Sequence, residues 1–259
     1  MQQHICKNCK HVFEGNFCNH CGQKSKTERL NFHYLQDEIK YTFLHINKGL
    51  LYSVKQLLVR PGDTVREFLE GKRVNHYKPI LLLVVLAGIN GLLTHYLDLS
   101  EIFKNSQAIM INANDRSVDY SKKVMDWIME HYSLFEIIQL PFVSLASYLA
   151  FKKYGYNFIE NIIINSFAAS QRLIYGLLIF PLDYFAIKFN FFGLFTILSL
   201  VFIILISIWF YIKLFKDKVI GDVIVRLLLF GFLAFMFFSI LLVAFGFFYA
   251  MYNSQLGVH

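Results

Sequence analysis

The sequence has no cysteine beyond residue 21. All four cysteines of the 259-residue chain lie within the first 21 residues, so no thiol is left to form a disulfide elsewhere. The N-terminal region also lacks an apolar stretch of the kind found in a cleavable signal peptide, and we expect no secretory signal there. These two absences favour a reducing compartment, where clustered cysteines bind metal in preference to pairing as disulfides.

The common catalytic signatures are absent as well. The sequence contains no H-E-x-x-H, no G-x-S-x-G, no phosphate-binding P-loop and no G-x-G-x-x-G. Its nine histidines are dispersed, and no predicted membrane span carries two of them four residues apart. We therefore predict that the protein is not an enzyme.

Charge is scarce after residue 79, whereas apolar residues are abundant. Hydrophobic residues make up 56% of the chain, above the roughly 45–50% of a soluble domain, and the excess lies in long runs that indicate contact with lipid. By contrast, residues 1–78 hold 13 lysines and arginines against 7 acidic residues. A basic surface of this kind is attracted to anionic lipid headgroups. Nucleic acid is the competing partner, but these charges are interspersed with acids and form no stripe, so we expect no nucleic-acid binding.

The four cysteines form the pattern C-x2-C-x8-C-x2-C, which predicts a small zinc ribbon in residues 1–26. Each C-x2-C pair directs two thiolates to one point, and the eight-residue spacer allows a short hairpin with Gly15-Asn16 at its tip. Covalent haem is excluded because neither pair is followed by histidine, and an iron site of the rubredoxin type normally has a longer spacer. We expect zinc binding and folding to be one event. The predicted ligands are Cys6, Cys9, Cys18 and Cys21.

Residues 27–78 are predicted to form amphipathic helices and a segment that leads into the membrane. Apolar residues recur with the helical period from Phe32 to Leu57, and Asn47 and Gly49 mark a break. This helical stripe packs on the protein or lies among the headgroups. Arg60-Pro61 ends it, and Thr64 and Glu67 read as a capping box that opens a further helix. The basic residues expected to anchor the membrane end are Lys72, Arg73 and Lys78.

Five long apolar stretches predict an all-α polytopic membrane domain over residues 79–252. The expected transmembrane helices lie near residues 80–97, 134–151, 158–187, 189–212 and 227–252. Residues 98–133 become the one sizeable external loop, with a short interfacial helix at 118–131. With the N-terminus in the cytoplasm, each cytoplasmic turn is rich in lysine, whereas the external loop holds four basic against six acidic residues. The C-terminus is then outside.

The third expected span carries an unusual set of polar residues, namely Asn165, Gln171 and Arg172. Ionisable groups at membrane depth often mark a transport path, and Glu136, Glu160 and Asp183 are candidate counter-charges. Polar side chains also hold transmembrane helices together, and we favour that structural interpretation.

The sequence resembles two families of membrane proteins. The cysteine pairs with Phe17 and the Gly22-Gln23 sequence, followed by Arg60-Pro61-Gly62 and Gly71-Lys72-Arg73, resemble a bacterial family of unknown function that has an N-terminal zinc ribbon and a multi-pass membrane domain. More distantly, Arg60-Pro61 ahead of a short helix and five spans is similar to the Yip family. The first resemblance implies the cell (inner) membrane, and the second implies a non-enzymatic role in membrane organisation.

The leading hypothesis is a membrane scaffold or adaptor whose ribbon is presented to a cytoplasmic protein, with the lipid bilayer as its other partner; homo-oligomerisation stays open. The alternative is a transporter or permeation module built on the polar residues of the third span. The residues expected at the ribbon's binding surface are Lys7, Asn8, His11, Phe13 and Phe17.

Overall fold

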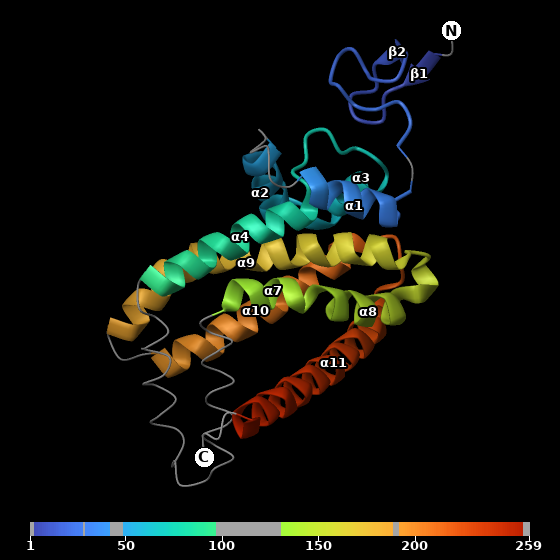
Figure 1. The fold of residues 1–259 in the computed structure, drawn as a ribbon. Coiled ribbons are helices and arrows are strands. Elements are labelled where there is room, and N and C mark those ends of the chain that lie inside the picture. Colours follow the sequence, from blue (N-terminus) through green and yellow to red (C-terminus); the bar gives the residue numbers. More distant parts are fainter. Residues whose placement is uncertain (1–2, 28, 42–48, 97–130, 189–191, 256–259) are drawn as a thin grey trace.

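The structure is a computed structural model that describes residues 3–27, 29–41, 49–96, 131–188 and 192–255. Its longest helices are formed by the long apolar stretches of the sequence. Within these residues, four segments are long and apolar enough to cross a membrane: Ser133–Tyr154, Phe158–Leu182, Ile197–Leu214 and Ile220–Ala244. The helices that form them are α7 (Tyr132–Ile138), α8 (Leu140–Phe151) and η1 (Lys152–Tyr154), then α9 (Phe158–Lys188), α10 (Phe192–Leu214) and α11 (Ile220–Gln255) (Figure 1).

The predicted fold class, an all-α polytopic membrane protein with an N-terminal four-cysteine cluster, is confirmed. Four of the five expected spans meet the criteria of length and apolarity. The first corresponds to α4 (Pro79–Tyr96), whose apolar part, Pro79–Leu93, is shorter than the other four. The predicted interfacial helix at 118–131 lies almost wholly outside the described residues.

Helix α9 is the centre of the bundle. Every residue from 160 to 171 is buried, and α9 packs against α4, α8 and α10. This stretch is rich in Asn, Ser and Ala, the small and polar residues that let transmembrane helices approach closely. Helix α11 is the opposite case, because it packs mainly on α8 and leaves large side chains such as Leu228 and Val243 exposed. In a bilayer those side chains face lipid.

The connector forms three short helices, α1 (Phe32–Tyr41), α2 (Gly49–Val59) and α3 (Pro61–Leu69). The expected capping box is wrong, since α3 begins at Pro61 and Thr64 lies inside it, where its hydroxyl donates to the carbonyl of Arg60. Proline suits the first helical turn because its φ is already helical and its missing N–H has no partner there. Gly71, at φ +105°, follows the end of α3, where the left-handed conformation of glycine commonly ends a helix.

Helix α3 is joined closely to the end of α10. A Cβ on Gly62 would lie 2.2 Å from the carbonyl carbon of Lys213, so only glycine permits this approach. The guanidinium of Arg66 donates to the main-chain oxygens of Lys213 and Leu214, at 2.6 Å each. These are last-turn carbonyls, which have no partner within their own helix. The connector therefore lies at the end of the bundle where the turn between α10 and α11 is found.

Candidate metal centre

The N-terminal residues form a hairpin of two very short strands, β1 (Gln3–Ile5) and β2 (Val12–Glu14). They pair antiparallel, with Ile5 opposite Val12 and His4 opposite Phe13. A two-stranded hairpin of this length is not stable alone, so it needs a further constraint. The cysteines that flank it supply the groups for one.

Two equivalent loops place the cysteines. In the first, the amide of Cys6 donates to the carbonyl of His11 and the amide of Lys10 donates to that of Cys6. In the second, Cys18 and Gly22 make the same pair of bonds, with the carbonyls of Gln23 and Cys18. Lys10 and Gly22, the residues directly after each C-x2-C pair, both have positive φ, at 64° and 76°. The positive φ after each pair turns the chain back so that both thiols of a loop point inward.

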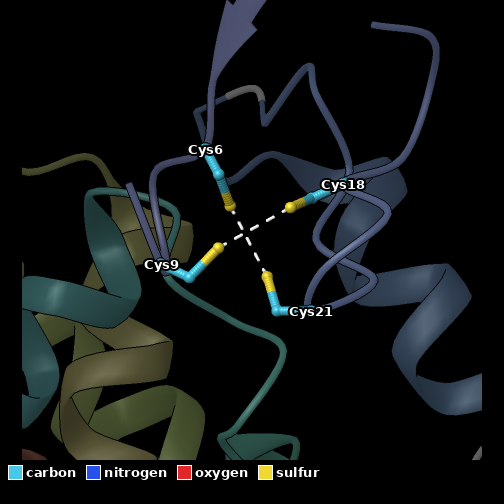
Figure 2. A group of neighbouring side chains, drawn as sticks. All are labelled: Cys6, Cys9, Cys18 and Cys21. Carbon is cyan, nitrogen blue, oxygen red and sulfur yellow. Dashed lines mark hydrogen bonds between the residues drawn. The ribbon is translucent and has the colours of Figure 1, made fainter. Parts of the chain in front are cut away.

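The four sulfur atoms converge on one point (Figure 2). The Sγ atoms of Cys6 and Cys21 are 3.5 Å apart, and those of Cys9 and Cys18 are 3.6 Å apart. All four lie within 4.8 Å of one another, and none forms a disulfide. Cys6 and Cys18 are buried, and Cys9 and Cys21 are partly exposed. This arrangement fits a single metal ion held by four thiolates.

The thiols perturb one another's ionisation strongly. For Cys9, a backbone hydrogen bond from His11 lowers the pKa, but burial and hydrogen bonds to the other thiols raise it to about 12. For Cys21, burial raises the pKa, whereas hydrogen bonds from Gln23, Asn8 and the other thiols lower it to about 6. Four thiolates so close together repel one another without a cation between them, and a bound metal removes that repulsion.

The exposed surface of the ribbon differs in part from the expected one. Phe13 is only 4% exposed and packs in the ribbon core, because the strand pairing turns it toward Cys6 and Cys18. Phe17 is exposed as expected, and it is accompanied by Ile5 and Val12. Ile5 and Val12 are cross-strand partners, and their side chains therefore share one face of the hairpin.

The linker after the ribbon is fixed to the bundle by an ion pair. Arg29 donates to both carboxylate oxygens of Glu160 at 2.7 Å, and to the carbonyl of Gly155 at 2.6 Å. Leu30 is buried in the main hydrophobic core, and its carbonyl accepts a hydrogen bond from the Asn157 side chain. Glu160 is thus paired with the linker, although it was a candidate counter-charge for Arg172.

The polar residues of α9 bond to neighbouring helices. Tyr211 of α10 donates to the side-chain oxygen of Asn165 at 2.7 Å. Gln171 donates to the carbonyl of Leu57 at 3.0 Å and so satisfies a last-turn carbonyl of α2. These two residues of the predicted polar cluster therefore use their hydrogen-bonding groups to hold helices together.

Arg172 belongs to a different contact. Its guanidinium lies 4.0 Å from the carboxylate of Glu136 in α7, which is one of the counter-charges expected for it. The side chain of Asp183 lies outside the part of the chain that can be described. Arg172 is therefore close to Gln171 in sequence but reaches another helix.

The predicted membrane anchors take part in contacts within the protein. Lys72 pairs with Glu67 at 3.3 Å. The guanidinium of Arg73 lies over the rings of Tyr34 and Phe68, at 5.1 and 5.6 Å from their centroids. Lys78 is partly buried. The basic cluster therefore also fixes the segment between α3 and α4.

One known family overlaps the chain. A model described as "Protein of unknown function (DUF3667)" matches residues 47–90. This segment contains α2, α3 and most of α4, including the Arg60-Pro61 and Gly71-Lys72 motifs. No curated protein and no solved structure matches the chain. The expected likeness to a family of unknown function is thus found in the connector and in α4. The match does not reach the cysteines. The resemblance to the Yip family stays a prediction.

Proposed function

We propose that the protein is a membrane-anchored adaptor whose N-terminal zinc ribbon is presented to a protein partner in the cytoplasm. The observation that carries this proposal is the convergence of four thiols on one point, beside exposed apolar side chains. Zn–S bonds of about 2.3 Å in a tetrahedron place the sulfurs about 3.8 Å apart. The sulfur–sulfur distances of 3.5 and 3.6 Å are close to this value, which supports a tetrahedral four-thiolate site of the kind that zinc occupies. A closed site of this kind has no open position for substrate, which supports a non-enzymatic role.

A cytoplasmic ribbon is supported by the position of the basic turns. Arg29 binds Gly155 in the turn between α8 and α9, and Arg66 binds the end of α10. The ribbon linker and both lysine-rich turns are therefore at one end of the bundle. The positive-inside rule assigns such an end to the cytoplasm, and the inner membrane of a bacterial cell is the location proposed.

The partner surface is the face that carries Ile5 and Val12, which are 71% and 53% exposed. Side chains of this kind on a small, metal-held scaffold can enter an apolar pocket of a partner at low entropic cost, because the scaffold is already ordered. The ribbon also carries the exposed lysines Lys7, Lys10 and Lys24, whose positive charge favours a partner surface with acidic residues.

Co-purification from native membranes in mild detergent tests this proposal. We expect a defined protein to accompany the wild type and to be lost with Ile5→Ser/Val12→Ser. The matched control is Ile5→Val/Val12→Ile, which keeps the surface apolar and is expected to retain the partner. Zinc content is measured in all three, so that loss of binding can be separated from loss of the ribbon. The adaptor role is contradicted if the zinc-loaded wild type brings down no partner, or if the partner is retained in Ile5→Ser/Val12→Ser.

A second candidate is a transporter or permeation module within the bundle. The contact between Arg172 and Glu136 favours it, because an ion pair among transmembrane helices is costly to bury and often marks a path for a charged solute. The bonds of Asn165 and Gln171 to other helices favour a structural role for those residues. We rank transport second for this reason.

A further inference from the structure

The second metal loop is linked directly to the segment between α3 and α4. Gln23 is 3% exposed, and its side-chain oxygen accepts hydrogen bonds from the amides of Arg73 and Val74 at 3.2 and 3.3 Å. The main-chain oxygen of the same residue accepts the amide of Cys18 at 2.8 Å, which closes the loop around the thiols. Gln23 therefore binds both the second cysteine loop, through its main chain, and the segment that leads into α4, through its side chain.

The first metal loop reaches the same segment. Lys7 lies between Cys6 and Cys9, and its ammonium donates to the carbonyl of Thr27 at 3.3 Å. A Cβ on Gly71 would lie 2.4 Å from the Thr27 hydroxyl and 3.3 Å from the Lys7 side chain. Both loops thus contact residues 71–74, directly or through Thr27, and the contact leaves little room for a side chain at position 71.

A second attachment does not involve the ribbon. Arg29 is bound to Glu160 and Gly155, and Leu30 is 1% exposed in the main core. These residues follow the ribbon in sequence and contact the turn between α8 and α9. The ribbon consequently has one attachment that depends on the shape of the metal loops and one that does not.

We propose that metal occupancy of the four-cysteine cluster determines whether the ribbon is docked on residues 71–74. The ribbon is too small to keep its loops without the metal, since its core consists of Phe13 and the cysteines. Removal of the metal releases Gln23 and Lys7 from the docking contact, while Arg29 and Leu30 keep the ribbon tethered. The protein then has two states, a docked and a tethered one, and only the docked state presents Ile5 and Val12 in a fixed position. This inference rests on the proposed metal-binding role of the ribbon.

Hydrogen exchange of the purified full-length protein in detergent tests it. Peptides that cover residues 71–75 are compared between the zinc-loaded protein and protein stripped with a chelator. A hydrogen bond of ordinary net strength corresponds to about a fivefold change in an opening equilibrium. We expect exchange at Arg73 and Val74 to become at least about fivefold faster on stripping, whereas peptides from residues 160–171 of α9 are unchanged.

Two variants make the test specific. Gln23→Ala leaves all four ligands in place, so it is expected to retain zinc and yet to show the faster exchange at residues 73–74. Arg29→Ala, the matched control, is expected to retain zinc and slow exchange at 73–74 while loosening residues 155–160. A purified chain that binds no zinc overturns the proposed metal site itself. If the purified protein binds zinc but exchange at 73–74 does not change when the zinc is stripped, the docking inference alone is overturned. The same holds if Gln23→Ala retains zinc and its exchange at 73–74 is unchanged.

Discussion

Replacement of Gly62 by alanine tests how α3 is seated on α10. The added Cβ would lie 2.2 Å from the carbonyl carbon of Lys213 and 2.4 Å from the amide nitrogen of Leu214. Both are main-chain atoms at the end of a helix, which cannot move aside as a flexible side chain can. Overpacking of this kind costs about 1–3 kcal/mol, and we expect the upper end, about 3 kcal/mol, because α3 must lift and the bonds of Arg66 lengthen with it.

The assay is thermal unfolding in detergent, followed by the intrinsic fluorescence of the two tryptophans. For a chain of this size, about 3 kcal/mol corresponds to a fall in Tm of roughly 6–12 °C. The control is Gly88→Ala in α4, another helical glycine, where an added Cβ meets nothing within 4 Å. Alanine there is expected to leave Tm unchanged or to raise it, since glycine is the poorer helix former. Equal Tm values for the two variants would refute the close seating of α3.

Three further predictions concern polar side chains. Gln171→Leu leaves the carbonyl of Leu57 without its donor and should lower the free energy of unfolding by about 1–3 kcal/mol, measured in the same thermal assay. The control is Gln171→Met, which keeps the length of the side chain but not its amide. An equal loss of stability in both variants would show that the amide group is responsible and not the shape of the side chain. Burial lowers the pKa of His76 to about 4 from the 6.5 expected when unfolded. The unfolded chain therefore binds a proton that the folded chain excludes, so stability is full above about pH 6.5 and falls by about 3 kcal/mol as the pH drops to 4. His76→Phe should flatten this part of the pH–stability curve, and an unaltered slope would show that another group causes it. Arg172→Leu is expected to insert and fold normally and to leave a cellular phenotype of the gene intact, and loss of that phenotype would favour transport over the adaptor role.

The features that could be predicted from the sequence are those with a local cause. Helices α9 to α11 follow from long apolar runs, whose backbone groups can be satisfied in a membrane only within a helix. The cysteine cluster follows from spacing, because two C-x2-C loops on a short spacer have few ways to fold around one ion. The capping-box spacing of Thr64 and Glu67 places the start of α3 four residues late, because Pro61 is an equally good first residue.

The features that could not be predicted depend on contacts between distant parts of the chain. Nothing in the sequence near Gln23 indicates that its side chain binds the amides of Arg73 and Val74, fifty residues away. The sequence offers Glu160 as one of three candidate counter-charges for Arg172 and does not choose among them, whereas in the structure Glu160 pairs with Arg29 in the ribbon linker. The burial of Phe13 had a usable signal, since alternation along a strand that begins with exposed Val12 directs the next side chain inward.

The segment that matches a family of unknown function is the part of this chain where the other parts meet. Within residues 47–90, Leu57 accepts a bond from α9, Gly62 and Arg66 contact the end of α10, and Arg73 contacts the ribbon. None of these contacts forms a closed pocket with a convergent nucleophile or base, and each of them attaches this segment to another part of the protein. Gly62 is required there by the close approach of α10, and Arg66 satisfies carbonyls that have no partner within their own helix. If the protein is the adaptor proposed above, the side chains that select its partner are the exposed ones of the ribbon, with Ile5 and Val12 first among them.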